Sequence, residues 1–132
     1  MIVLDTHIWL WWVNEDWQQI KPIWRSRIEQ CEEVGVSAIS CFEVAWLDHH
    51  GRIKLPCPVT DWFQMALGGS DIRLLPITPE IASCAVALTQ HHSDPQDRLI
   101  IATALTHAGQ LISADNKFAL YEELSDALIA WR

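Results

Sequence analysis

The chain has 132 residues, half of them hydrophobic, and a formal net charge of −8 at neutral pH. This length suits one domain with a single core, so we predict one domain over residues 1–132. No apolar run reaches the ~18 residues that a helix needs to span a bilayer, and we expect no membrane partner. The acidic balance argues against a broad basic face for nucleic acid.

We expect a cytoplasmic protein whose cysteines are reduced. Asp5 interrupts the apolar start of the chain and no basic segment precedes it, which differs from a signal peptide. The cysteines include no CxxC pair, and no Cys/His group has the spacing of zinc ligands. Cysteine and histidine therefore offer no predicted metal site.

Taken in chain order, short β-like runs alternate with helical ones. The predicted strands are residues 2–4, 34–38, 72–77, 110–113 and 127–131. The predicted helices are residues 6–13, 17–33, 40–50, 60–67, 79–90 and 95–108, followed by a short helical turn at 116–121. Such alternation predicts an α/β fold with a mostly parallel sheet of four to five strands and helices on both faces.

Four acidic residues stand where sites form in such sheets, beyond the carboxyl ends of the strands. Asp5 and Asp115 follow predicted strands, and Glu43 and Asp97 lie in the first turns of predicted helices. Each also has an ordinary explanation. Asp5 can cap a helix and Asp115 can bond within a turn. Ser40 and Glu43 fit a capping box, and Asp97 favours the helix dipole.

The joint placement of these acids favours a metal site. Carboxylates that share one crevice repel each other unless a cation lies between them. Mg²⁺ or Mn²⁺ suits a site of carboxylates and water, and such ions also bind phosphate oxygens. The pattern therefore predicts metal-dependent chemistry on a phosphate ester. Asp94 is either a helix cap before Pro95 or a further ligand, and the hydroxyls of Thr6 and Ser113 can orient the ligands.

Four segments carry a family resemblance: IVLDTHIWLWW, VSAISCFEVAWLDHHGRIKLP, HSDPQDRLIIATALTHAGQLISADNKF and ALIAW. They resemble PIN-domain ribonucleases, and among these the VapC-type toxins of type II toxin–antitoxin systems. The resemblance covers residues 1–132. It implies a three-layer α/β/α sandwich, a Mg²⁺- or Mn²⁺-dependent endoribonuclease, a homodimer and a small antitoxin protein that blocks the site. It carries the acidic quartet of the family to Asp5, Glu43, Asp97 and Asp115.

With this resemblance, we expect metal-activated water to hydrolyse an RNA phosphodiester bond. Asp5 and Asp97 are the expected direct metal contacts, whereas Glu43 and Asp115 hold metal-bound waters or a second ion. One bound ion and two remain equally compatible with the sequence.

Lysine and arginine supply most phosphate contacts to nucleic acids. The residues expected to make them are Arg98, Lys117, Arg52 and Lys54, with a solvated surface charge as the alternative for each. Because the overall charge attraction is weak, we expect a structured RNA such as tRNA or rRNA, recognised by its folded shape or by an exposed loop.

The chain also contains eight tryptophans. Core packing accounts for several of them, but residues 8–13 are apolar on nearly every side of a helix. We therefore expect part of this helix in an interface with a second copy or an antitoxin, where tryptophan is enriched.

Two other functions use the same features. A Mg²⁺-dependent phosphatase-type hydrolase would use the same acids, but the sequence has no glycine-rich phosphate loop and no DxD motif after the first strand. A non-catalytic partner-binding domain would use the acids as caps and the tryptophans as its surface, and the complete acidic quartet argues against it.

Overall fold

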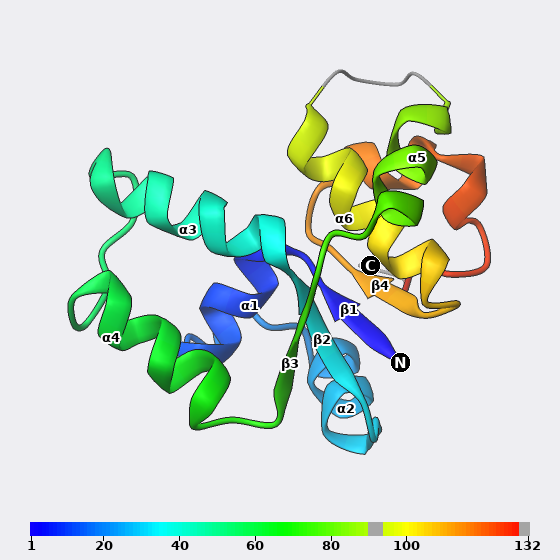
Figure 1. Ribbon diagram of the computed structural model, residues 1–132. Coiled ribbons are helices and arrows are strands. Elements are labelled where there is room, and N and C mark those ends of the chain that lie inside the picture. Colours follow the sequence, from blue (N-terminus) through cyan, green and yellow to red (C-terminus); the bar gives the residue numbers. More distant parts are fainter. Residues whose placement is uncertain (90–93, 130–132) are drawn as a thin grey trace.

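The structure, a computed structural model, describes residues 1–89 and 94–129. Its centre is a parallel sheet with the strand order β3-β2-β1-β4 (Figure 1). The strands are β1 (Ile2–Leu4), β2 (Val34–Ser37), β3 (Ile72–Leu75) and β4 (Gln110–Ile112). The helices are α1 (Thr6–Val13), α2 (Pro22–Gln30), α3 (Ala38–His49), α4 (Val59–Phe63), α5 (Pro79–Ala87) and α6 (Pro95–Thr106). Shorter helical turns are η1 (Gln64–Gly68), η2 (Asn116–Leu120) and η3 (Glu122–Leu124).

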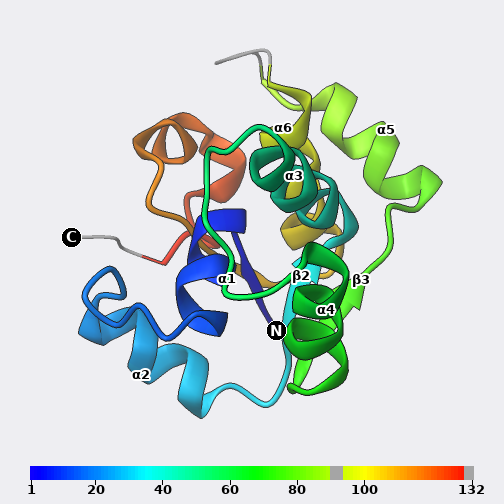
Figure 2. The same ribbon diagram turned by 90° about the vertical axis from the view of Figure 1, so that its left-hand side faces the viewer.

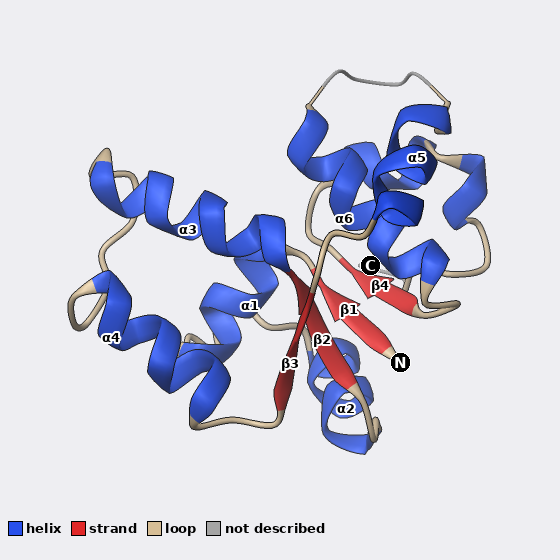
Figure 3. Ribbon diagram, in the orientation of Figure 1, coloured by secondary structure: helices blue, strands red, loops and turns tan. Residues whose placement is uncertain are grey.

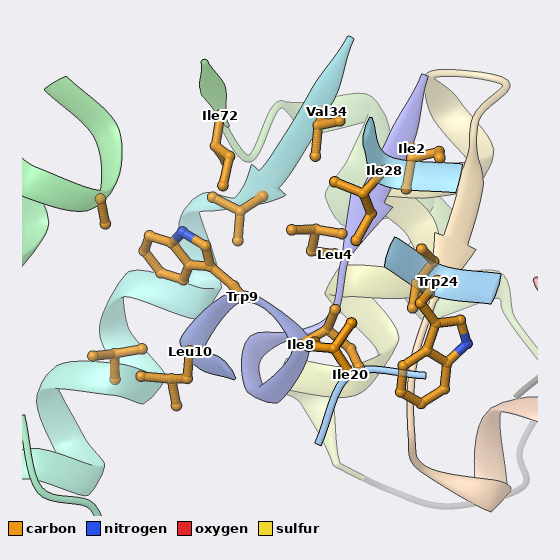
Figure 4. Packing of buried hydrophobic residues seen from close by; sticks show 14 of the residues in the cluster. Ile2, Leu4, Ile8, Trp9, Leu10, Ile20, Trp24, Ile28, Val34 and Ile72 are labelled. Atoms are coloured by element: carbon orange, nitrogen blue, oxygen red, sulfur yellow. The ribbon is translucent and has the colours of Figure 1, made fainter. Parts of the chain in front are cut away.

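Helices cover both faces of the sheet, as Figures 2 and 3 show. Side chains alternate between the two faces of a strand, so Ile2 and Leu4 pack with α1 and α2 whereas Val3 packs with α6. Figure 4 shows the first of these two cores, in which Ile8 and Trp9 of α1 lie against the strands. The predicted α/β fold with a parallel sheet is confirmed.

The order of the strands reverses at β1, because β2 and β3 lie on one side of it and β4 lies on the other. Leu4 is level with Val36 of β2 and with Ile112 of β4. The residues that follow these three strands therefore share one edge of the sheet. Parallel α/β proteins bind ligands in the crevice at such a reversal.

Two predicted helix starts are wrong. The helix predicted over 17–33 begins at Pro22, because proline has no N–H and fits only a first helical turn, and Lys21 before it is extended. The helix predicted over 40–50 begins at Ala38, because the Ser37 hydroxyl accepts a hydrogen bond from the backbone N–H of Ile39. The capping-box interpretation of Glu43 is therefore wrong, and Glu43 lies in the second turn of α3.

Other boundaries also differ from the prediction. The third strand ends at Leu75, directly before Pro76, which cannot donate to a neighbouring strand. The helix predicted over 60–67 divides into α4 and the π-helical turn η1. Of the strand predicted over 127–131, Leu128 forms a single parallel bridge to Leu111, and residues 130–132 lie outside the described part of the chain.

Tryptophan builds much of the core beside α1. Trp9, Trp24 and Trp62 have exposed fractions of 0–1%. The rings of Trp9 and Trp62 meet edge to face with their centroids 4.9 Å apart, and the Trp62 indole donates to the Asn14 side chain at 2.8 Å. Most of the apolar surface of α1 is thus used inside the chain.

Other large apolar side chains remain at the surface, among them Trp17, Phe42, Trp46 and Met65. Trp11 and Trp12 are only partly buried. The predicted interface of α1 with another protein stays a prediction, and Trp131 lies outside the described residues. In the part of the chain that the structure describes, no helix has the length and hydropathy to cross a membrane.

We expect Trp9→Ala to lower the free energy of unfolding by about 3–5 kcal/mol, because it leaves a cavity where a fully buried indole packed. Trp46→Ala is the matched control, since 42% of that side chain is exposed, and should cost less than about 1 kcal/mol. Urea unfolding followed by circular dichroism measures both. Equal losses would contradict the burial of Trp9 in the core.

Candidate active site

Asp5 occupies the junction between β1 and α1. It caps α1 and is buried, with an exposed fraction of 7%. One carboxylate oxygen accepts the backbone N–H of Thr6 at 2.8 Å, and the other accepts the hydroxyl of Ser113 at 2.7 Å. Ser113 follows β4, so its bond to Asp5 joins the carboxyl ends of two neighbouring strands. The carboxylate is therefore held at the point where the sheet reverses its order.

Asp94 and Asp97 come from the start of α6. Asp94 caps this helix, with its carboxylate accepting the backbone N–H of Gln96 at 2.9 Å. Asp97 lies in the first turn and is partly buried. Pro95 fits the first helical position between them because its missing N–H has no helical partner there.

Asp115 starts η2 just after β4. Its carboxylate accepts the backbone N–H of Lys117 at 2.9 Å, and its own N–H donates to Ser113 at 3.0 Å. The Ser113 hydroxyl therefore contacts two of the acidic residues. It donates to the carboxylate of Asp5 and accepts the backbone N–H of Asp115.

Glu43 reaches the same region from α3. The hydroxyl of Thr6 donates to the hydroxyl of Ser40 at 2.9 Å, and both side chains are fully buried. This bond joins α1 to α3 one turn before Glu43. Thr6 thus contacts Asp5 through its backbone, whereas its hydroxyl fixes the position of the neighbouring helix.

These acids line one pocket of about 400 Å³. Its lining consists of Asp5, Glu43, Asp94, Asp97 and Asp115 together with His7, Trp11, Ala114 and Lys117. Figure 3 shows α1 and α3 beginning where β1 and β2 end, which brings the side chains of separate segments to this edge.

The pocket raises the pKa values of its most buried acids. Burial raises the pKa of Asp5 to about 6, although hydrogen bonds from Ser113 and Thr6 oppose the shift. The pKa of Asp97 is raised to about 8. Burial is the largest cause, and the charges of the other four acids add to it. The pocket thus concentrates more negative charge than its surroundings compensate.

This donor set fits a hard divalent cation. The available ligand atoms on the acids are carboxylate oxygens, which Mg²⁺ and Mn²⁺ prefer. Within residues 1–89 and 94–129, however, no three His, Cys, Asp or Glu side chains are grouped as a ready-made metal site. Such a pocket suits an ion that keeps several of its waters and uses few direct protein ligands, as Mg²⁺ does.

The predicted phosphate-binding residues do not lie together. Lys117 is exposed and lines the acidic pocket. Arg52 is exposed with its guanidinium 5.9 Å from the centre of the Trp46 ring, and Lys54 lines a different pocket. The structure therefore brings only Lys117 of this group to the acids.

The prediction that Arg98 contacts phosphate is wrong. Its exposed fraction is 6%, and its guanidinium donates to backbone carbonyls at the end of α5 and to the Tyr121 hydroxyl. Because the guanidinium is buried and donates to these acceptors, a phosphate group cannot reach it.

Three residues of the pocket were absent from the predicted site: Ala114, which precedes Asp115 in the chain, and the aromatic residues His7 and Trp11. His7 and Trp11 stand one turn apart on α1, with ring centroids 6.0 Å from each other. Their i, i+4 spacing, starting two residues after Asp5, is the signal that would have placed both beside it.

Fold and pocket together define an α/β protein with an acidic crevice beyond its strand ends. The model of the PIN domain family matches residues 2–124, and the chain belongs to this family. It is 40% identical over 117 residues to "Ribonuclease VapC22" of Mycobacterium tuberculosis (strain ATCC 25618 / H37Rv), covering 88% of each chain. The predicted resemblance to VapC-type PIN domain proteins is therefore confirmed.

Solved structures share the fold at low sequence identity. VapBC2 from Rickettsia felis, bound to a DNA fragment from its promoter, has a TM-score of 0.69 at 17% identity over all of both chains. A toxin–antitoxin complex from Klebsiella pneumoniae has a TM-score of 0.65 at 21% identity, covering 98% of this chain and 97% of that one. FitAcB from Neisseria gonorrhoeae has a TM-score of 0.60 at 20% identity, with the same two coverages.

We expect Asp97→Asn to reduce the pH dependence of stability. Because the folded-state pKa is raised to about 8, the folded protein binds more protons than the unfolded chain between pH ~4 and ~8. Wild-type stability therefore falls as pH rises through this window, and the neutral amide removes this contribution. Thermal unfolding in EDTA from pH 4 to 9 measures it, and Asp97→Asn should raise the melting temperature more at pH 8 than at pH 5.

The matched control for that measurement is Asp71→Asn, an exposed acid outside the pocket. It should leave the pH dependence of the melting temperature as in the wild type. An Asp97→Asn curve parallel to that of the wild type would contradict the assigned pKa shift.

Proposed function

We propose that this chain is a Mg²⁺- or Mn²⁺-dependent endoribonuclease, the toxin of a toxin–antitoxin pair. The observation that carries the proposal is the gathering of five acidic side chains in one pocket beyond the strand ends. The 40% identity to a protein named a ribonuclease supports RNA as the substrate.

In this proposal, Asp5 and Asp97 hold the metal directly, while Glu43 and Asp115 hold water bound to it. Asp94 caps α6 and adds negative charge at the rim. The metal, when bound, lowers the pKa of a water molecule and neutralises charge on the phosphoryl oxygens. The raised pKa of Asp97 means that protons compete with the metal for this carboxylate.

Other residues keep the acids in place. The Ser113 hydroxyl and the Thr6 N–H fix both oxygens of Asp5, which limits its rotation. The bond between Thr6 and Ser40 fixes α3 against α1 and hence sets the position from which Glu43 reaches the pocket. Such outer contacts orient ligands before a metal arrives.

On the substrate side, Lys117 is the residue we propose for a phosphate contact, because it is exposed and lines the pocket. Arg52 and Lys54 are exposed on the segment that follows α3 and would contact phosphates further along the strand. A structured RNA such as tRNA or rRNA fits a chain with a net charge of −8, because shape then contributes more than charge attraction.

We also propose an antitoxin partner, a homodimer and a cytoplasmic location. The partner is supported by similar solved structures that are themselves toxin–antitoxin complexes. Exposed apolar side chains on α3 and η1, Phe42, Trp46 and Met65, offer surface for a protein contact.

Asp5→Asn and Asp97→Asn should each reduce the rate of Mg²⁺-dependent RNA cleavage by about 100-fold or more, beyond the loss expected for an outer contact. The amide removes the negative charge that holds the cation while keeping the size of the side chain. Purified variants with native circular dichroism are compared with the wild type on total tRNA, with and without EDTA. Asp61→Asn, an exposed acid on α4, is the control and should keep full activity.

Cleavage at the wild-type rate by either pocket variant would reject the assignment of that residue. Activity of the wild type in EDTA would reject the metal. Hydrolysis of a small phosphate monoester without RNA cleavage would favour the phosphatase-type alternative.

Lys117→Met should lower the slope of log affinity against log salt concentration by about 1, as expected when one phosphate contact is lost. Binding is measured with the inactive Asp97→Asn background so that the RNA stays intact. Arg73→Met, an exposed residue of β3 that pairs with Glu33, is the control. An unchanged slope for Lys117→Met would exclude its contact with phosphate.

A further inference from the structure

Arg98 is a buried arginine whose hydrogen-bonding capacity is completely used. A guanidinium has five N–H donors, and the structure gives it five acceptors. Nε donates to the carbonyl of Ala85 at 3.0 Å, Nη1 to the carbonyl of Thr89 at 3.1 Å and the hydroxyl of Tyr121 at 3.5 Å, and Nη2 to the carbonyls of Val86 at 3.3 Å and Leu88 at 2.6 Å.

These acceptors belong to the end of α5. The last carbonyls of a helix have no partner within it and carry partial negative charge. Helix α5 has no basic residue in its own last turn and ends in an extended residue, Leu88. Arg98, on the following helix, supplies both the missing donors and the positive charge.

The same side chain also reaches the segment after β4. Tyr121 is the residue at the end of η2, the turn that Asp115 starts. Thr89 adds a second link, because its N–H and its hydroxyl both donate to the carboxylate of Glu123, at 3.0 and 3.1 Å. The end of α5, the start of α6 and the segment from η2 to η3 are thus joined around one guanidinium.

Asp97 and Asp115 lie in the segments that Arg98 joins. Neighbouring residues of a helix point about 100° apart, so the direction of Arg98 toward α5 fixes the direction in which Asp97 leaves α6. Asp97 then lines the acidic pocket, as does Asp115 at the other end of η2. A displaced α6 would move Asp97 relative to Asp5 on the rigid sheet.

We propose that Arg98 is a positioning residue for the acidic pocket: by capping the end of α5 and binding Tyr121, it sets the places of Asp97 and Asp115. The proposal rests on the proposed function, since the pocket is taken as the metal site. Arg98 touches neither the metal nor the RNA and acts only through these two acids.

Two variants of Arg98 separate its charge from its hydrogen bonds. Arg98→Lys keeps the positive charge but has three donors for five acceptors. Arg98→Met keeps much of the length and removes both. Arg27→Met is the matched control, because Arg27 is half-buried and its guanidinium binds Gln110 at the opposite end of β4. Ile28→Ala, at a buried core residue of α2, is a control for lost stability alone.

The measurements are the Mn²⁺ affinity of the folded protein, kcat and KM for RNA cleavage, and NMR contacts between α6 and β1, which pack against each other. Arg98→Met should lower the Mn²⁺ affinity about tenfold and kcat by a similar factor, the loss typical of a residue that orients ligands. KM should change little. Arg98→Lys should recover part of both, and the two control variants should keep the wild-type Mn²⁺ affinity at a temperature where they are folded.

A lower melting temperature of Arg98→Met with unchanged Mn²⁺ affinity and unchanged NMR contacts would overturn the proposal, since Arg98 would then stabilise the fold only. If Arg98→Met does not fold, Arg98→Lys decides by the same readouts. If the wild type neither binds Mn²⁺ nor cleaves RNA, the proposed function fails. The NMR contacts of Arg98→Lys then test the positioning role independently of metal binding. If they are the same as in the wild type, the positioning role of Arg98 is rejected.

Discussion

The structure around the pocket depends on the burial of one carboxylate, that of Asp5, where the sheet reverses its order. Its two oxygens accept from Thr6 and Ser113, which belong to segments that are more than one hundred residues apart in the chain. The bond from Ser113 joins the ends of β1 and β4, and the same hydroxyl accepts the N–H of Asp115, so two of the acids are held together. Burial raises the pKa of this carboxyl group, a cost that the surrounding hydrogen bonds offset only in part.

The acids around Asp5 combine structural and electrostatic roles. Asp94 and Asp115 each accept a hydrogen bond from a backbone N–H at a helix start. These bonds offset part of the repulsion between the acids of the pocket. Asp97 has the most strongly raised pKa, to about 8, because it is partly buried and faces all the others. Keeping these acids together lowers the stability of the fold and concentrates negative potential in the pocket. This pattern is usual at functional sites.

Much of the fold follows from local patterns in the sequence. The strand at Ile2–Leu4 and the helix at Thr6–Val13 have the predicted bounds, because an apolar run followed by Asp and Thr defines both a strand and a cap. Errors occur where two local signals compete. Ser37 rather than Ser40 caps α3, and Pro22 starts α2 inside the longer helix that was predicted over residues 17–33. In both places, the residue that can satisfy or avoid a free N–H at the helix start determines the boundary.

The sequence by itself determined which residues carry charge at the strand ends, because that follows from the β/α alternation alone. The tertiary structure decided how each charge is used. Lys117 lies at the pocket whereas Arg98, beside an acid in sequence, is turned into the interior by the free carbonyls of α5. His7 and Trp11 likewise belong to the pocket only because their side of α1 faces it together with residues of α3, α6 and η2. Such choices depend on which partners a side chain meets across distant segments, and a linear pattern does not contain them.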